Sequence, residues 1–205
     1  MDASGDLRAR IEEGATKRRS KRLVHRRARS IWWKRLGLFV VVVIAATVSL
    51  RTWVIEPFWI PSESMEPTLH GCVGCKDDRL LVNKLAYKLH DPRRGDIVVF
   101  RRPANFSSSD QDLVKRVIGL PGETVSGHDG LVWIGDRPLT EPYVSPNCHG
   151  TGDFPPVVVP AKDVFVMGDN RCNSSDSRVF GPIPQSSIVG RAFVTFWPFG
   201  RLHWL

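Results

Sequence analysis

The pattern of apolar and polar residues changes twice along the 205 residues of the chain. Residues 1–35 are polar, residues 36–55 are almost entirely apolar, and residues 56–205 alternate short apolar runs with Gly, Pro, Asn and Asp. The apolar segment begins "LGLFVVVVIAATVSL" and, read through Arg51 to Ile55, gives twenty residues, or about 30 Å of helix. That length matches the hydrocarbon core of a bilayer. We therefore predict one transmembrane helix at residues 36–55.

A buried core helix and a cleavable signal peptide are the alternatives for this apolar segment. Four consecutive valines and an Arg-rich flank favour lipid over a protein core, and Trp32, Trp33 and Trp53 flank the segment as an interfacial aromatic belt would. A signal peptide is about 15–30 residues long in total. Here the basic region alone spans 35 residues, and no clear small-x-small cleavage site follows. The pattern favours an uncleaved anchor.

Residues 56–205 have the pattern of an antiparallel, mainly β domain. Short apolar runs rich in β-branched residues recur between turn residues, which is typical of strands. One stretch, residues 77–91, fits either a helix or a strand, and the polar, Ser-rich stretch 103–112 predicts an exposed loop. The clearest predicted strands lie within residues 96–100, 112–120, 130–135, 155–160 and 163–169.

The positive charge is confined to the N-terminal region. Residues 1–35 hold twelve Lys or Arg and four Asp or Glu, a net charge of +8, whereas residues 36–205 have a net charge of zero. A nucleic-acid-binding domain would spread basic residues over a folded face, so we expect no nucleic-acid partner. We interpret residues 1–35 as a flexible tail held near anionic lipid. The positive-inside rule then places this tail in the cytoplasm and residues 56–205 outside the cell membrane.

The four cysteines all lie in the region placed outside the membrane, where disulfides can form. Only one CxxC pair is present, whereas a four-cysteine zinc site usually needs two close pairs, and no βαβ setting supports a thioredoxin-like role. We predict a disulfide between Cys148 and Cys172, because Cys148 lies in a connection poor in apolar residues, and a second one between Cys72 and Cys75. Both crossed pairings of these residues, and free thiols, stay open as alternatives.

A Ser-Lys pair is the catalytic chemistry that the residues themselves suggest. No metal-binding histidine motif and no G-x-S-x-G motif is present, while "IPSESMEPTL" (60–69) places two serines in a loop stiffened by two prolines. Strand alternation places Lys115 on the same face as Leu113 and Val117. Burial there would lower the lysine pKa by several units, and a neutral lysine can accept a serine proton. Taken alone, the pattern also fits a surface lysine.

Four motifs in order resemble those of bacterial type I signal peptidases. They are "IPSESMEPTL", "RGDIVVF" (94–100), "VKRVIGLPGE" (114–123) and "GDNRCNSSDSR" (168–178), and the similarity runs from about Arg51 to the C-terminus through "RPLTEPY" and "GRAFVTFWPFGRL". Members of this family are membrane-anchored Ser-Lys proteases that cut signal peptides from exported proteins. Their antiparallel β fold combines a shared catalytic core with a variable insert.

The resemblance implies a role for each matching residue. Ser64 matches the nucleophile, Lys115 the general base, and Ser62 the hydroxyl that lines the oxyanion hole with the Ser64 N–H. Ser174 matches the hydroxyl that hydrogen-bonds and orients the lysine. In the family, a polar scaffold holds the loop that carries Ser174 against the strand that carries Lys115; its members correspond here to Asp169, Arg171, Asp176 and Arg178. Shallow pockets for small substrate side chains are lined at the positions of Phe58, Ile60, Met65, Leu69, Leu113 and Val114.

We therefore expect a membrane-bound serine endopeptidase that removes signal peptides after a small residue, with no metal or cofactor. Its expected partners are preproteins and the phospholipid bilayer, and we expect a monomer. A self-cleaving repressor of the LexA type, which uses the same dyad on a related fold, would need a DNA-reading domain. A non-catalytic binding or redox module is a further alternative. Two residues depart from the family pattern: Glu63, where Gly is frequent and where we expect little effect, and Cys172, where Asp is common.

Overall fold

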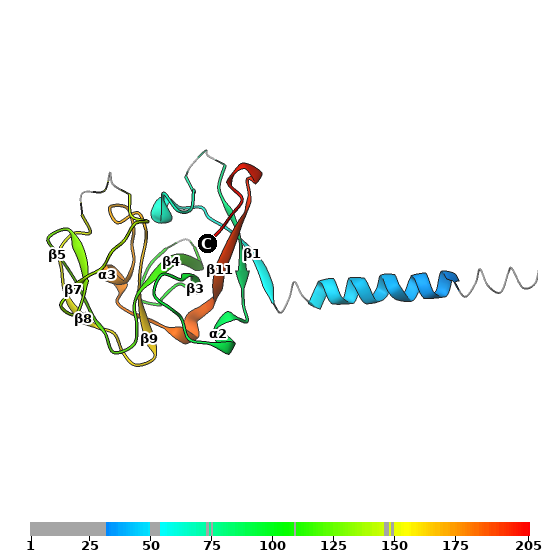
Figure 1. Cartoon of the computed structure of the whole chain (residues 1–205), viewed down its shortest axis with the longest axis horizontal. Helices are drawn as coiled ribbons and strands as arrows, with labels where there is room; N and C mark the ends of the chain where they lie inside the picture. Colours follow the sequence, from blue (N-terminus) through cyan, green and yellow to red (C-terminus); the bar gives the residue numbers. More distant parts are fainter. Residues whose placement is uncertain are drawn as a thin grey trace, which may run out of the picture. The chain divides into compact units, whose positions relative to one another are not determined.

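The computed structural model describes residues 32–49, 54–72, 74, 76–108, 110–145, 148 and 150–205. Two compact units divide the chain, one ending at Leu50 and the other beginning at Arg51. In the first unit the apolar segment forms a helix, Trp32–Ser49, which is long and apolar enough to cross a membrane (Figure 1). Residues 1–31 of the expected basic tail lie outside the described residues.

The predicted end of the transmembrane helix at Ile55 is wrong. Val54 lies in a turn and Ile55 begins strand β1 (Ile55–Trp59), where it pairs with Asn83 of strand β2 (Arg79–Asn83). Residues 50–53 lie outside the described residues. Ile55 continues the apolar run in sequence, yet its backbone groups belong to the sheet ladder.

The second unit is mainly β and antiparallel, which confirms the predicted fold class. An eight-stranded sheet has the order β1-β2-β11-β3-β4-β9-β10, with β12 paired to β11, and the remaining strands form a four-stranded sheet of order β7-β6-β5-β8. The larger sheet contains β1 (Ile55–Trp59), β2 (Arg79–Asn83), β3 (Ile97–Arg101), β4 (Asp112–Gly119), β9 (Asp163–Met167), β10 (Ile183–Pro184), β11 (Ile188–Trp197) and β12 (His203–Trp204). The smaller sheet contains β5 (Thr124–His128), β6 (Leu131–Ile134), β7 (Arg137–Pro138) and β8 (Phe154–Val158).

Helices in this unit are short and connect strands. The ambiguous stretch 77–91 contains both states: strand β2, then a turn in which the Asn83 side chain accepts a hydrogen bond from the Leu85 N–H, then helix α2. The Leu85 N–H is thus bonded within the turn, by a side chain, where the chain leaves the strand. The helical segments are α2 (Ala86–Leu89), α3 (Ser177–Phe180), and the 3₁₀ turns η1 (Glu63–Met65), η2 (Gln185–Ser187) and η3 (Phe199–Arg201).

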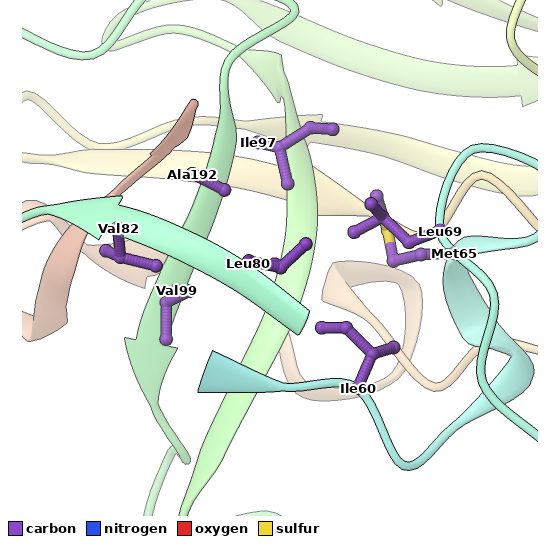
Figure 2. Close-up of a cluster of buried hydrophobic side chains, with 8 residues drawn as sticks. All are labelled: Ile60, Met65, Leu69, Leu80, Val82, Ile97, Val99 and Ala192. Atoms are coloured by element: carbon purple, nitrogen blue, oxygen red, sulfur yellow. The ribbon is translucent and has the colours of Figure 1, made fainter. Parts of the chain in front are cut away.

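One apolar cluster connects the η1 turn to the larger sheet. Met65 and Leu69 contribute to it from η1 and the residues that follow, and both are fully buried. Figure 2 shows them grouped with side chains from β2, β3 and β11. Because a buried side chain of this size stabilises by roughly 1.5–3 kcal/mol, this cluster fixes the turn on the sheet. Its buried members are Ile60, Met65, Leu69, Leu80, Val82, Ile97, Val99 and Ala192.

A further cluster joins the two sheets. Phe165 and Met167 of β9, with Ile118 of β4, pack against Val125 of β5 and Val132 of β6. In Figure 1 the strands β5, β7 and β8 lie together beside β9 and α3. The smaller sheet is thereby held against the part of the larger sheet that carries β4 and β9.

Candidate active site

Ser64 and Lys115 are in direct contact although 51 residues separate them. Lys115 Nζ donates a hydrogen bond to Ser64 Oγ over 2.6 Å. Ser64 is the middle residue of η1, and Lys115 lies in the middle of β4. The side chain of Lys115 makes no other hydrogen bond within the described part of the chain. A nucleophile and a base within hydrogen-bond reach form the geometry of a Ser-Lys dyad.

Burial sets the protonation of Lys115. The residue is only 3% exposed, which decides between the buried lysine and the surface lysine that strand alternation alone left open. Desolvation penalises the charged form and lowers the lysine pKa to about 8, while the nearby carboxylates of Asp176 and Asp169 oppose this change. At mildly alkaline pH a large share of the amine is therefore neutral and able to accept a proton.

The η1 turn presents Ser64 and Ser62 to the same space. Ser62 has extended backbone angles and ends the segment that follows β1, and its Oγ lies 3.2 Å from Ser64 Oγ. The turn is closed by bonds from the Glu66 N–H to the Glu63 carbonyl and from the Leu69 N–H to the Met65 carbonyl. These bonds, with buried Met65 below, hold Ser64 in one orientation.

The loop after β9 contacts the η1 turn directly. The Asn170 N–H donates to the Ser64 carbonyl oxygen over 3.1 Å, and the Asn170 side chain donates to the Glu63 carbonyl over 3.1 Å. Gly168 packs so closely here that a Cβ on it would lie less than 3.0 Å from both the Ser64 carbonyl oxygen and Ser174 Oγ. The backbone approach at this point requires glycine.

Ser174 does not make the hydrogen bond to Lys115 that we expected. Its Oγ donates instead to Asp176 Oδ2 over 2.8 Å. A carboxylate is a stronger acceptor than an amine, and Asp176 is only two residues away. Asp176 also raises the pKa of Lys115, so in this structure Ser174 is connected to the lysine through Asp176, and it also lies against Gly168.

Asp169 connects the loop after β9 to β4, the strand that carries Lys115. Fully buried, it accepts two bonds from Arg116, which follows Lys115 on β4, at 2.8 and 2.6 Å. Thr68 Oγ1 also donates to Asp169 Oδ2, over 2.5 Å. One carboxylate thus joins β4, the residues after η1 and the loop after β9.

The other charged residues of the scaffold find different partners. Arg171 donates two bonds to Glu141, at 2.6 and 2.7 Å, and its guanidinium is fully buried. Arg178 pairs with Asp176 and also donates to the Thr151 carbonyl over 2.7 Å. Asp176 is the N-cap of α3. These bonds anchor the loop to the segment that follows the smaller sheet's β7 and to the residues before β8.

The candidate pocket residues divide into two groups. Ile60, Met65 and Leu69 are buried members of the cluster beneath η1, and Phe58 and Val114 pack on its edge. Leu113 belongs to a different cluster and lines an open cleft of about 350 Å³ that also contains Ser62, Ser64 and Lys115. The apolar cluster and the cleft therefore meet at the dyad.

The cysteines pair as predicted where the structure describes them. Cys148 and Cys172 form a disulfide, which excludes both crossed pairings. Cys72 is also disulfide-bonded, and its predicted partner Cys75 lies outside the described residues. The Cys148–Cys172 bridge links the loop after β9 to the connection before β8.

Within the described residues, no three His, Cys, Asp or Glu side chains gather as a metal site.

Several site residues were not identified from the sequence. Arg116 follows Lys115 directly, and Tyr143, whose ring lies 4.0 Å from the Arg116 guanidinium carbon, is in the "RPLTEPY" motif with Glu141. Asn170 and Asn173 lie in "GDNRCNSSDSR". Their presence in these motifs indicated that they could belong to the site. Which residue each one contacts depends on long-range packing and could not be predicted.

Comparison with known proteins gives a consistent result. The family model described as "Signal peptidase, peptidase S26" matches residues 33–197. A signal peptidase I from Leptolyngbya laminosa is 45% identical over 174 residues, which cover 82% of this chain and 80% of the relative.

Two further matches come from other bacteria. A probable signal peptidase I-2 from a Synechocystis strain is 40% identical, with 83% of this chain and 76% of the relative covered. A solved signal peptidase I structure from Enterococcus faecalis is 39% identical, with 50% of this chain and 97% of that chain covered at a TM-score of 0.43.

Proposed function

The chain belongs to the signal peptidase family, peptidase S26, and we propose that Ser64 and Lys115 are its catalytic residues. It is a signal peptidase I, a serine endopeptidase that removes N-terminal signal peptides from preproteins. The 2.6 Å hydrogen bond between Lys115 Nζ and Ser64 Oγ in a buried site supports the residue assignment most strongly. The LexA-like, binding and redox alternatives are not favoured.

The dyad performs acyl transfer in two steps. Neutral Lys115 accepts the proton of Ser64 as Ser64 Oγ attacks the carbonyl carbon of the scissile peptide bond. The C–N bond breaks, the Lys115 ammonium protonates the leaving amine, and the signal peptide stays bound to Ser64 as an ester. Lys115 then takes a proton from water, which attacks this ester and releases the signal peptide as a carboxylic acid while Ser64 regains its proton.

An oxyanion hole accompanies the dyad in this proposal. Negative charge develops on the scissile carbonyl oxygen during each attack, and donors aimed at that position stabilise the transition state. The 3.2 Å spacing between Ser62 Oγ and Ser64 Oγ supports Ser62 as one donor, with the Ser64 N–H as the other.

An unpaired strand edge next to the dyad supports binding of an extended peptide. Strand β3 pairs with β4 from Asp112 to Arg116, whereas β9 occupies the opposite edge only from Arg116 to Gly119. Asp112–Lys115 therefore keep one edge without a strand among the described residues, and β1 lies at the end of the sheet. A substrate can add here as a strand. Residues before the cut would contact Phe58, Leu113 and the apolar cluster, which favours small side chains at the first and third positions.

The membrane arrangement completes the proposal. The helix Trp32–Ser49 spans the bilayer once, with the basic N-terminal region in the cytoplasm and the peptidase unit outside. Fifteen residues lead from Ser49 to Ser64, at most about 50 Å of chain. The nucleophile is thus tethered near the surface where the cleavage site of a signal peptide emerges from its apolar core. The protein acts as a monomer and needs no metal or cofactor.

The test is cleavage of a preprotein by the detergent-solubilised full chain, followed by sequencing of the product's N-terminus. We expect one new N-terminus directly after a small residue, and none with Ser64→Ala. Cleavage at many sites, or unchanged cleavage by Ser64→Ala, would contradict the proposal.

A further inference from the structure

Glu63 begins the η1 turn and lies between Ser62 and Ser64. Its side chain is exposed and ordered by a bond across the cleft: Asn173 Nδ2 donates to Glu63 Oε2 over 3.1 Å. Both residues line the cleft that contains Ser64 and Lys115. A carboxylate thus has a defined place in the cleft of the dyad, and the dyad mechanism does not use it.

The sheet register indicates which part of the substrate passes this carboxylate. The proposed substrate strand pairs along Asp112–Lys115, with the residues before the cut toward Leu113 and Phe58. From Arg116 onward β9 occupies the same edge, so the peptide has to leave the sheet at Lys115. The loop that begins at Gly168 and carries Asn173 starts next to this point of the sheet and is hydrogen-bonded to the η1 turn. The first residues after the cut therefore pass Glu63 and Asn173.

We infer that Glu63 is a specificity-determining residue, whose carboxylate favours a basic side chain, and disfavours an acidic one, in the first residues of the mature protein. This inference rests on the proposed function. Partly screened charge pairs at a protein surface change binding by small factors, so we expect a preference for Lys over Glu of about fivefold. The preference should decrease as the salt concentration rises, because salt screens exposed charges.

The experiment uses three preproteins with the same signal peptide, in which the second and third residues after the cut are both Lys, both Gln or both Glu. The ratio of kcat/KM for the Lys and Glu substrates is measured for each enzyme, so a general loss of activity cancels. Glu63→Gln removes the charge but keeps an acceptor for Asn173, and the ratio should fall to about one. Glu63→Lys should reverse it.

Glu66→Gln is the matched control, because it also removes a carboxylate close to Ser64. The Glu66 carboxylate pairs with His70 and does not line the cleft. This variant should keep the ratio of the unmodified enzyme. Three results would overturn the inference while cleavage itself continues. The unmodified enzyme could show no preference, the preference could survive Glu63→Gln, or Glu66→Gln could lose the preference to the same extent. If none of the three substrates is cleaved, the proposed function fails and the inference with it.

Discussion

The N–H of Asn170 donates to the carbonyl oxygen of Ser64 over 3.1 Å, so the loop after β9 is bonded directly to the residue proposed as nucleophile. Gly168 lies against the same carbonyl oxygen and against Ser174. The position of Ser64 thus depends on a loop more than 100 residues away in sequence. The catalytic geometry is sensitive to changes in that loop even where no reacting atom is touched.

Gly168→Ala should slow the enzyme through this contact. The added methyl group would lie less than 3.0 Å from the Ser64 carbonyl oxygen, a backbone atom that cannot move without the turn. A displacement of about 1 Å can cost on the order of a hundredfold in rate. We expect kcat to fall by about that factor. Gly200→Ala, where a Cβ has open space, is the control and should retain activity. Full activity in Gly168→Ala would show that the loop can relax.

The rate should depend on the ionisation of Lys115. Only the neutral amine accepts the serine proton, and burial lowers the lysine pKa to about 8. Below pH 8 the protonated fraction grows, so kcat/KM should fall about tenfold per pH unit, and above pH 8 it should level off. A pH profile of single-turnover cleavage measures this. An acidic limb near pH 10.5, or no dependence between pH 6 and pH 9, would exclude Lys115 as the base.

Ser62→Ala should remove one oxyanion donor and lower kcat by about a hundred- to a thousandfold, because such donors act mainly in the transition state. Ser62→Thr keeps a hydroxyl and should be affected less. The measurement is kcat with saturating preprotein for both variants. Equal activity of the Ala variant and the unmodified enzyme would make Ser62 a turn residue only.

Removal of the Cys148–Cys172 disulfide should reduce both stability and activity. The bridge spans a sequence separation of 24 residues, for which chain-entropy estimates give roughly 3 kcal/mol of the free energy of unfolding. Its loss also releases the loop that carries Ser174 and Asp176, whose carboxylate raises the pKa of Lys115. Urea unfolding and kcat/KM of the Cys148→Ser, Cys172→Ser double variant measure the two effects. Reduced stability with unchanged kcat/KM would mean that the bridge does not position the site.

Local patterns predicted much of the fold. Short apolar runs between turn residues predicted β3, β4, β6, β8 and β9. Strand alternation placed Lys115 on the same face as Leu113 and Val117, because the side-chain period of a strand is independent of its partner. The end of the apolar helix was not predictable in the same way. A run of apolar residues fits helix and strand equally, and only the pairing of Ile55 with Asn83 decides between them.

The polar contacts of the site were less predictable because they join distant segments. Arg171 and Glu141 are 30 residues apart, and Asn173 and Glu63 are 110 apart. Motif resemblance identified Ser64 and Lys115, but it implied a Ser174–Lys115 bond that is replaced by the bond from Ser174 to Asp176. It also gave Glu63 no role, since Gly at that position has no side chain to compare.

The most direct test of the Ser64–Lys115 dyad is the double-mutant comparison of single-turnover cleavage rates for Ser64→Ala, Lys115→Met and the double variant, each confirmed as folded by circular dichroism. Met has nearly the length of Lys without its charge, so it should fill the same buried space. Because nucleophile and base act as one unit, each single variant should lose essentially all cleavage, and the double variant should be no slower than either one. Substantial cleavage by Lys115→Met, or losses that add in the double variant, would contradict the assignment of these two residues as a catalytic pair.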